Sequence, residues 1–314
     1  MPAYRDQLPQ LDGRLFLTDG GIETTLIFHE GFELPYFAAF HLLRDERGRS
    51  ALRSYYARYA AIARREGLGF ILESPTWRAS ADWGDKLGYS ERDLARANRD
   101  SIALMQELRK EFETPRAPVV ISGCVGPRGD GYDPGQLMSP SEAEGYHLAQ
   151  IRAFAEAGAD MVTAITITNA NEAIGIARAA RRSGMPAAIS FTLETDGRLP
   201  TGQTLKNAIE EVDNATSGSP AYYMINCAHP THFESALSGG PWAKRIRGVR
   251  ANASRRSHQE LNDAPDLDDG DPAELGHQYG DLLRLHPQIN VLGGCCGTDH
   301  RHIEHICQSC RVTT

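Results

Sequence analysis

Eight short apolar segments alternate with helix-like segments along the 314 residues of the chain. The segments are apolar throughout instead of alternating with polar residues, which is typical of parallel strands covered by helices. They lie at residues 15–21, 70–73, 118–122, 161–167, 187–193, 221–226, 246–251 and 289–292. Eight strand-helix units, spaced by about 40 residues, predict an α/β fold with one (β/α)8 barrel of the TIM type. We expect residues 1–314 to form a single domain.

Apolar residues at helical spacing predict the segments that cover this barrel. The expected helices are 50–65, one that begins at Ser90, one from Ser139 or Ser141 to about Ala157, 171–182, 204–212, a short one after Pro230, 272–285 and 300–307. The two longest connections, 24–45 and 252–271, are expected to be βα loops, and the acidic second one to be mobile.

Composition and charge exclude several classes of function. The net charge is −8 and the basic residues are scattered, whereas a nucleic-acid surface needs a concentrated basic face. No apolar run approaches the roughly 18 residues that span a bilayer, and residues 1–14 have no signal-peptide core. We therefore expect a cytoplasmic protein that binds neither nucleic acid nor membrane; a homo-oligomer stays open. In a reducing compartment, six cysteines favour metal binding or catalysis over disulfides.

Three cysteines follow two of the predicted strands. Cys227 comes directly after the strand 221–226, and Cys295 and Cys296 follow the strand 289–292 in a Gly-rich turn. Barrel enzymes bind ligands at the carboxyl ends of their strands, so these thiols are expected on one rim. Thiolates are good Zn²⁺ ligands, and a catalytic zinc site keeps one position open. We hypothesise that the three cysteines bind one Zn²⁺ that activates an incoming thiol as a thiolate.

Other interpretations of the cysteines remain. A buried cysteine often behaves as a small apolar residue, and a disulfide between Cys295 and Cys296 is disfavoured in a reducing compartment. Cys307 and Cys310 form a CxxC pair without a second pair, which favours a surface position with no metal or redox role. Cys124 is expected just after the third strand, packed in the core or at the rim.

Two further residues have alternative roles. His229 follows the Cys227 thiol by two residues and could accept a proton, but a solvated or helix-capping histidine is favoured. Asp19, at the end of the first strand, could bind an ammonium group or cap the turn before Gly20 and Gly21.

Three motifs resemble the homocysteine S-methyltransferase family over nearly the whole chain. They are Asp-Gly-Gly at 19–21, Asn-Cys at 226–227 and Gly-Gly-Cys-Cys-Gly-Thr at 293–298. The resemblance implies a zinc-containing (β/α)8 barrel that methylates homocysteine to methionine with a small-molecule methyl donor. It also implies zinc ligation by Cys227, Cys295 and Cys296.

The resemblance further implies an acceptor pocket built from several strand ends. Asp19 would contact the amino group of the acceptor, and Asn226 would orient the neighbouring thiolate or close the pocket wall. The stretch after the second strand, with Ser74, Thr76 and Trp77, would line the pocket.

One position departs from the family pattern. Ile165 stands before Thr166 where the family usually has an acidic residue that holds the homocysteine ammonium group. Replacement of the acidic residue by isoleucine removes a charge-assisted contact of about 1.5–3 kcal/mol. Either Asp19 and Thr166 suffice to bind the ammonium group, or the acceptor is a thiol without the usual amino-acid end. Residues 250–254 also differ from the family pattern, so the donor is not specified. A zinc- or thiol-binding protein without catalytic activity is a third alternative.

Overall fold

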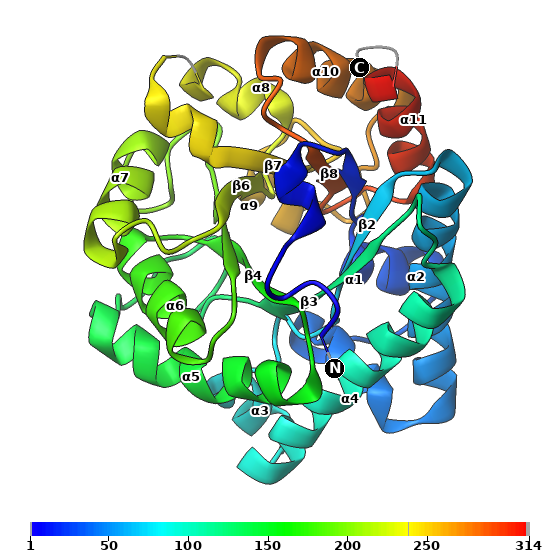
Figure 1. Ribbon diagram of the computed structural model, residues 1–314, viewed down its shortest axis with the longest axis vertical. Coiled ribbons are helices and arrows are strands. Elements are labelled where there is room, and N and C mark those ends of the chain that lie inside the picture. Colours follow the sequence, from blue (N-terminus) through cyan, green and yellow to red (C-terminus); the bar gives the residue numbers. More distant parts are fainter. Residues whose placement is uncertain (1, 238, 312–314) are drawn as a thin grey trace.

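The computed structural model describes residues 2–237 and 239–311, and its centre is a closed barrel of parallel strands. Each strand pairs with the next one along the chain, and β1 closes the barrel against β8 (Figure 1). The strands are β1 (Phe16–Leu17), β2 (Gly69–Glu73), β3 (Val119–Val125), β4 (Met161–Ile167), β5 (Ala187–Thr192), β6 (Tyr222–Asn226), β7 (Ile246–Ala251) and β8 (Val291–Gly294). The predicted (β/α)8 barrel is confirmed.

Helices form the outer layer of the barrel (Figure 1). The longer ones are α2 (Glu46–Glu66), α4 (Glu91–Phe112), α5 (Pro140–Ala157), α6 (Ala170–Arg182), α7 (Leu205–Thr216), α10 (Pro272–Leu285) and α11 (His300–Arg311). The short helices α1 (Ile22–Thr24), α3 (Ala81–Lys86), α8 (Pro230–Phe233) and α9 (His258–Asn262) lie in the connections that follow strands. The apolar faces of the longer helices pack on the outside of the sheet and form, with the strands, the main hydrophobic cluster of the protein.

Polar residues define where several helices begin. Ser90 accepts a hydrogen bond from the backbone of Asp93 as the N-cap of α4, as its position predicted. Ser139 forms a capping box with Glu142 at the start of α5. The helix predicted from residue 50 begins earlier, at Glu46, because Asp45 caps it by accepting from the Gly48 amide at 2.8 Å.

The N-terminal segment closes one end of the barrel. In Figure 1 it crosses the centre of the strand ring in dark blue. The carbonyl of Gln10 accepts from Asn290 at 2.7 Å and from Arg247 at 3.2 Å. Leu8 packs with inward-facing residues of the strands, among them Phe16 and Met224. Since this end is filled, ligands have access from the opposite end, where the carboxyl ends of the strands meet.

Several expectations from the sequence need correction. Strand β3 extends to Val125, so Cys124 lies within the strand and not after it. The connections expected to be loops contain a π-helical turn at Thr25–His29, 3-10 turns at Pro35–Phe37 and Ala39–Arg44, and α9. The surface position expected for Cys307 and Cys310 is wrong, because both lie on the inward face of α11 and are 1% and 0% exposed.

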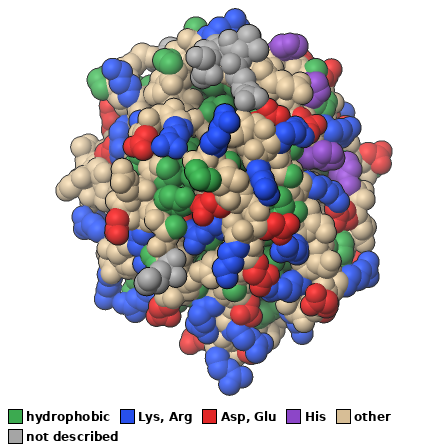
Figure 2. Space-filling model, turned by 45° about the vertical axis from the view of Figure 1, so that its right-hand side comes forward, with side chains coloured by type: hydrophobic (Ala, Val, Ile, Leu, Met, Phe, Trp, Pro, Cys, Tyr) green, Lys and Arg blue, Asp and Glu red, His purple; other side chains and the backbone are tan. Residues whose placement is uncertain are grey.

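The surface carries charges of both signs. On the face shown in Figure 2, Lys and Arg lie among Asp and Glu without one continuous basic area. Within residues 2–237 and 239–311, no helix is long and apolar enough to cross a membrane.

Asp299 stabilises the beginning of α11, directly after the cysteine-bearing turn. Its carboxylate accepts from the Arg301 amide at 2.9 Å and from the Arg301 guanidinium at 2.8 Å. Burial alone raises the pKa of Asp299, but the contacts with His302 and Arg301 outweigh it and hold that pKa well below its usual value. The ionised carboxylate therefore stabilises the folded state above the unfolded pKa of about 3.9, and this contribution is lost as the pH falls through the lower folded pKa.

We predict that Asp299→Asn lowers the free energy of unfolding by about 1 kcal/mol at pH 7, since Asn keeps the cap but loses the charge. The difference from the unsubstituted protein should shrink as the pH falls below about 4. Urea unfolding at pH 7 and at a pH below about 4 measures this difference in the free energy of unfolding. Asp6→Asn, at an exposed position, is the control and should have no effect. An Asp299→Asn deficit that grows in acid would contradict the prediction.

Candidate active site

Two strand ends bring three cysteines together at the carboxyl rim. Cys227 follows β6, and Cys295 and Cys296 follow β8. Strand β7 lies between β6 and β8 and pairs with both. The Cys227 amide donates to Arg250 O at 3.1 Å, and the Cys295 amide donates to Ala251 O at 2.8 Å. The end of β7 thus holds both cysteine-bearing turns, and the sequence correctly predicted that they meet.

The sulfur atoms of the three cysteines all lie within 4.8 Å of one another. Cys227 Sγ is 3.8 Å from Cys296 Sγ. Tetrahedral Zn²⁺ with Zn–S bonds of about 2.3 Å would place its sulfur ligands about 3.8 Å apart. When all three sulfurs are thiolates, the donor set therefore fits such an ion.

Cys227 and Cys295 form a disulfide in the structure. The sequence predicted reduced thiols, and the only disulfide it considered joined Cys295 to Cys296. The structure differs because the ends of β6 and β8 place the Cα atoms of Cys227 and Cys295 5.5 Å apart, within the usual disulfide range. The bond must be reduced before both residues can bind a metal.

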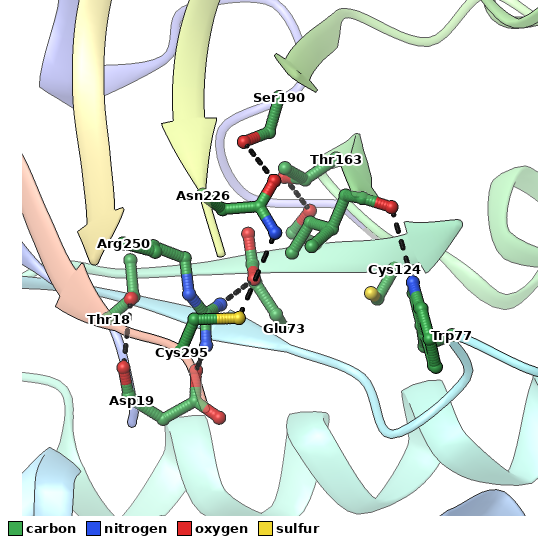
Figure 3. Close-up of polar contacts among 12 residues, drawn as sticks. Thr18, Asp19, Glu73, Trp77, Cys124, Thr163, Ser190, Asn226, Arg250 and Cys295 are labelled. Atoms are coloured by element: carbon green, nitrogen blue, oxygen red, sulfur yellow. Dashed lines mark hydrogen bonds and ion pairs between the residues drawn. The ribbon is translucent and has the colours of Figure 1, made fainter. Parts of the chain in front are cut away.

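Asn226 fixes the geometry beside the sulfur cluster (Figure 3). Its side-chain oxygen accepts from Ser190 Oγ at 2.6 Å and from the Thr166 amide at 2.9 Å. Its side-chain nitrogen donates to Thr166 Oγ1 at 2.9 Å and lies 3.8 Å from Cys295 Sγ. Thr166 and Cys227 both have positive φ, of 64° and 52°, which costs of order 1–3 kcal/mol at each such residue. The network around Asn226 holds this strained backbone in place.

Tyr132 and His258 also contact the cluster, and the sequence pointed to neither. The Tyr132 hydroxyl lies 3.6 Å from Cys227 Sγ and 3.5 Å from Cys296 Sγ. The Tyr132 ring packs on the His258 ring with 4.1 Å between centroids. Burial raises the pKa of Tyr132 well above its usual value, so at neutral pH its hydroxyl keeps the proton that it can donate to sulfur. Both residues come from βα connections, which carry no periodic pattern from which their positions could be predicted.

The residues expected to line the acceptor pocket lie in the turn after β2. Ser74 and Thr76 are buried, and their hydroxyls are 2.7 Å apart. Thr76 Oγ1 donates to Cys124 O at 2.7 Å, and Ser74 Oγ accepts from the Cys124 amide at 3.0 Å. Trp77 donates from its indole to Ile165 O at 3.2 Å (Figure 3). The two hydroxyls therefore shape the turn, and the Trp77 ring is fixed against β4.

A buried group of charges lies next to the cysteines (Figure 3). Arg250 Nη2 is 2.8 Å from Asp19 Oδ1, and Arg250 Nη1 contacts the Glu73 carboxylate. Arg250 also donates to Gly294 O at 3.0 Å. Tyr55 donates to Asp19 Oδ2 at 2.9 Å. Two carboxylates thus share one guanidinium, and all three charged side chains are at least nine-tenths buried.

Burial and charge act in opposite directions on these groups. Burial raises the pKa of Asp19, and the charge of Arg250 and the Tyr55 hydrogen bond oppose it. Burial, only partly offset by Arg250, raises the pKa of Glu73 to about 7. The sequence left Asp19 between an ammonium ligand and a turn cap, and it did not anticipate the ion pair with Arg250.

His229 caps a helix, as the favoured interpretation predicted. It is the N-cap residue of α8, and its ring accepts from the Thr231 amide. Burial, together with the charges of His232 and Arg255, lowers the pKa of His229 to about 4. The ring is therefore neutral at pH 7 and can act as this acceptor.

Comparisons with known proteins agree with this geometry. Residues 16–310 match the family model described as homocysteine S-methyltransferase. Homocysteine S-methyltransferase YbgG of Bacillus subtilis is 25% identical over 240 residues, which cover 70% of this chain and 72% of YbgG.

Solved structures share the fold. The oxidised form of the homocysteine methyltransferase MmuM from Escherichia coli superposes with a TM-score of 0.72 at 20% identity, covering 95% of this chain and 97% of MmuM. The metallated form of MmuM gives 0.72 at 19% identity, covering 96% and 98%.

We predict that Arg250→Met lowers the free energy of unfolding by about 3–5 kcal/mol, because it leaves two buried carboxylates without their cation. Chemical denaturation at pH 7 measures the loss. Arg53→Met is the matched control, since Arg53 pairs with Glu111 on the surface and should contribute less than about 1 kcal/mol. Equal losses in the two variants would contradict the structural role given to Arg250.

Proposed function

We propose, since the chain belongs to the homocysteine S-methyltransferase family, that this methyltransferase transfers a methyl group from a small-molecule donor to homocysteine, giving methionine, with Zn²⁺ bound by Cys227, Cys295 and Cys296. The observation that carries the proposal is the meeting of three sulfur donors within 4.8 Å at the carboxyl rim. We also propose that residues 1–314 act as one barrel domain.

The metal would supply one thing, a bound acceptor sulfur that stays a thiolate at neutral pH. This chain's own residues do the rest. The Tyr132 hydroxyl and the Asn226 amide can donate to the cysteine sulfurs, which stabilises their negative charge. Trp77 closes the side of the site toward β4. Asp19, Thr166 and the turn with Ser74 and Thr76 form the proposed surroundings of the acceptor.

The transfer itself is a displacement in line. The acceptor thiol loses its proton to solvent on binding, and its sulfur electron pair forms a bond to the methyl carbon of the donor. The bond between that carbon and the donor atom breaks, and its electron pair stays with the donor. Donors with a positively charged sulfur or nitrogen suit this step, because they leave as neutral molecules.

Ile165 supports an alternative acceptor. It is 7% exposed and apolar where the family pattern suggests an acid. A thiol without the usual amino-acid end is therefore the second candidate substrate, and a zinc- or thiol-binding protein without catalysis is the third. Calorimetric titration of the zinc-loaded protein with homocysteine separates the first two candidates. Only a homocysteine methyltransferase is required to bind homocysteine.

A panel of donors and acceptors tests the proposed reaction. Reduced, zinc-loaded protein is incubated with sulfonium, quaternary ammonium and methyl-corrinoid donors, each with homocysteine or another thiol, and the products are identified by mass. We expect methionine with at least one donor. Methylation of other thiols alone would support the second candidate, and stoichiometric zinc without any methylated product would support the third.

We predict that Cys295→Ser and Cys296→Ser each lose zinc and methyl transfer together while the barrel stays folded, because the site lies on turns above the core. Metal analysis, activity and circular dichroism measure the three properties. Cys310→Ala, in a buried position of α11, is the control and should keep its zinc. A Cys296→Ser protein with full zinc and full turnover would overturn the ligand assignment.

A further inference from the structure

The acceptor's ammonium group lacks an obvious partner on the two strands where a carboxylate is expected. Strand β4 offers Ile165 instead of an acid. Asp19, at the end of β1, already lies 2.8 Å from the Arg250 guanidinium and accepts from Tyr55. An ammonium group that relied on Asp19 alone would compete with a buried arginine that cannot lose its charge.

A second carboxylate lies on the short helix α1, four residues after Asp19. Glu23 is partly buried on this helix. Hydrogen bonds on both sides of it bind α1 to the cysteine-bearing turn. The Gly21 amide donates to Thr298 O at 3.0 Å, and the Gly297 amide lies 3.3 Å from Thr24 Oγ1. The first turn after β1 therefore carries Glu23 to the rim beside Cys295 and Cys296.

The close packing of this turn leaves little freedom for its position. A Cβ atom added at Gly21 would lie 2.5 Å from Cys295 O, so only glycine allows this approach.

Glu23 has no ionic partner of its own. Across residues 2–237 and 239–311, no Lys, Arg or His forms an ion pair with its carboxylate, in contrast to Asp19 and Glu73. Burial raises the pKa of Glu23 to about 7. A partly buried carboxylate without a cation gains most from a positively charged ligand, because that ligand offsets the cost of burial.

A cation from the neighbouring turn acts on Glu23 without forming an ion pair with it. Arg78 is 4% exposed, and its guanidinium lies 3.8 Å from the ring centroids of both Trp77 and Trp83. The charges of Arg250 and Arg78 both lower the pKa of Glu23, against the larger effect of burial. In the described part of the chain, Arg78 Nε is buried without a hydrogen-bond partner. The same guanidinium donates to Gly129 O at 2.8 Å and lies 3.8 Å from Asp130 Oδ2, so its charge is already partnered and Glu23 remains the group that a cationic ligand would pair with.

We propose that Glu23 binds the ammonium group of the acceptor and so replaces the acidic residue that β4 lacks. This proposal rests on the proposed function and makes it more specific. The acceptor is an amino-acid thiol such as homocysteine, and a thiol without an amino group would leave the Glu23 carboxylate unpaired. Glu23 is thus a specificity-determining residue, supplied by α1 instead of β4.

The test compares two thiols that differ in the amino group. Zinc-loaded protein is titrated calorimetrically with homocysteine and with 4-mercaptobutyrate, which lacks the amino group. Glu23→Gln should weaken homocysteine binding roughly 10- to 100-fold, since a charge-assisted contact is lost, and should leave 4-mercaptobutyrate binding unchanged. Glu33→Gln, at an exposed position of the following loop, is the matched control. The double variant Glu23→Gln/Ile165→Glu should recover homocysteine binding.

Each other outcome overturns a distinct statement. Unchanged homocysteine binding by Glu23→Gln, or an equal loss for both thiols, would remove Glu23 from ammonium recognition. Equal affinity of the unsubstituted protein for the two thiols would show that the site does not select the amino group. Failure of the unsubstituted zinc-loaded protein to bind either thiol would overturn the proposed function, and with it the acceptor on which this inference depends.

Discussion

The hydrogen bonds at the carboxyl end of β7 are the constraint on which the site depends. This strand end accepts from the Cys227 amide on one side and from the Cys295 amide on the other. The Ala253 amide just beyond it donates to Cys296 O at 3.1 Å. Cys227 and Cys295, which are 68 positions apart in the sequence, are therefore held at a Cα separation of 5.5 Å. A closed parallel barrel provides this proximity, because all its strands end at one rim.

The same strand end also carries the charge that fixes the arrangement of groups around the site. Arg250 joins Asp19 on β1's end to Glu73 on β2 and donates to the backbone of β8. Buried ion pairs of this kind specify an arrangement more than they add stability, since desolvation offsets much of their attraction. Here the ion pair with Arg250 engages the Asp19 carboxylate. On the proposal made above, recognition of a cationic acceptor group passes to Glu23, which forms no ion pair with a cation in the described part of the chain.

The periodicity of the sequence predicted the barrel and the meeting of the three cysteines, because short apolar runs and their ends depend on local pattern. It did not predict the partners of those cysteines. Tyr132 reaches the sulfurs, and His258 packs on the Tyr132 ring, from connections whose conformation depends on tertiary contacts. Cys310 was misplaced at the surface because a CxxC spacing says nothing about which face of a helix is buried. The absence of an acid at Ile165 was visible in the sequence, whereas the position of Glu23 needed the packing of α1.

Zinc K-edge X-ray absorption of the reduced, zinc-loaded protein tests the central claim most directly. The account predicts three sulfur neighbours at about 2.3 Å from the metal in the protein alone. After addition of homocysteine it predicts a fourth sulfur at the same distance, because the acceptor thiol fills the open position. Fewer than three sulfur neighbours in the protein alone, or a sulfur count that homocysteine does not change, would contradict it.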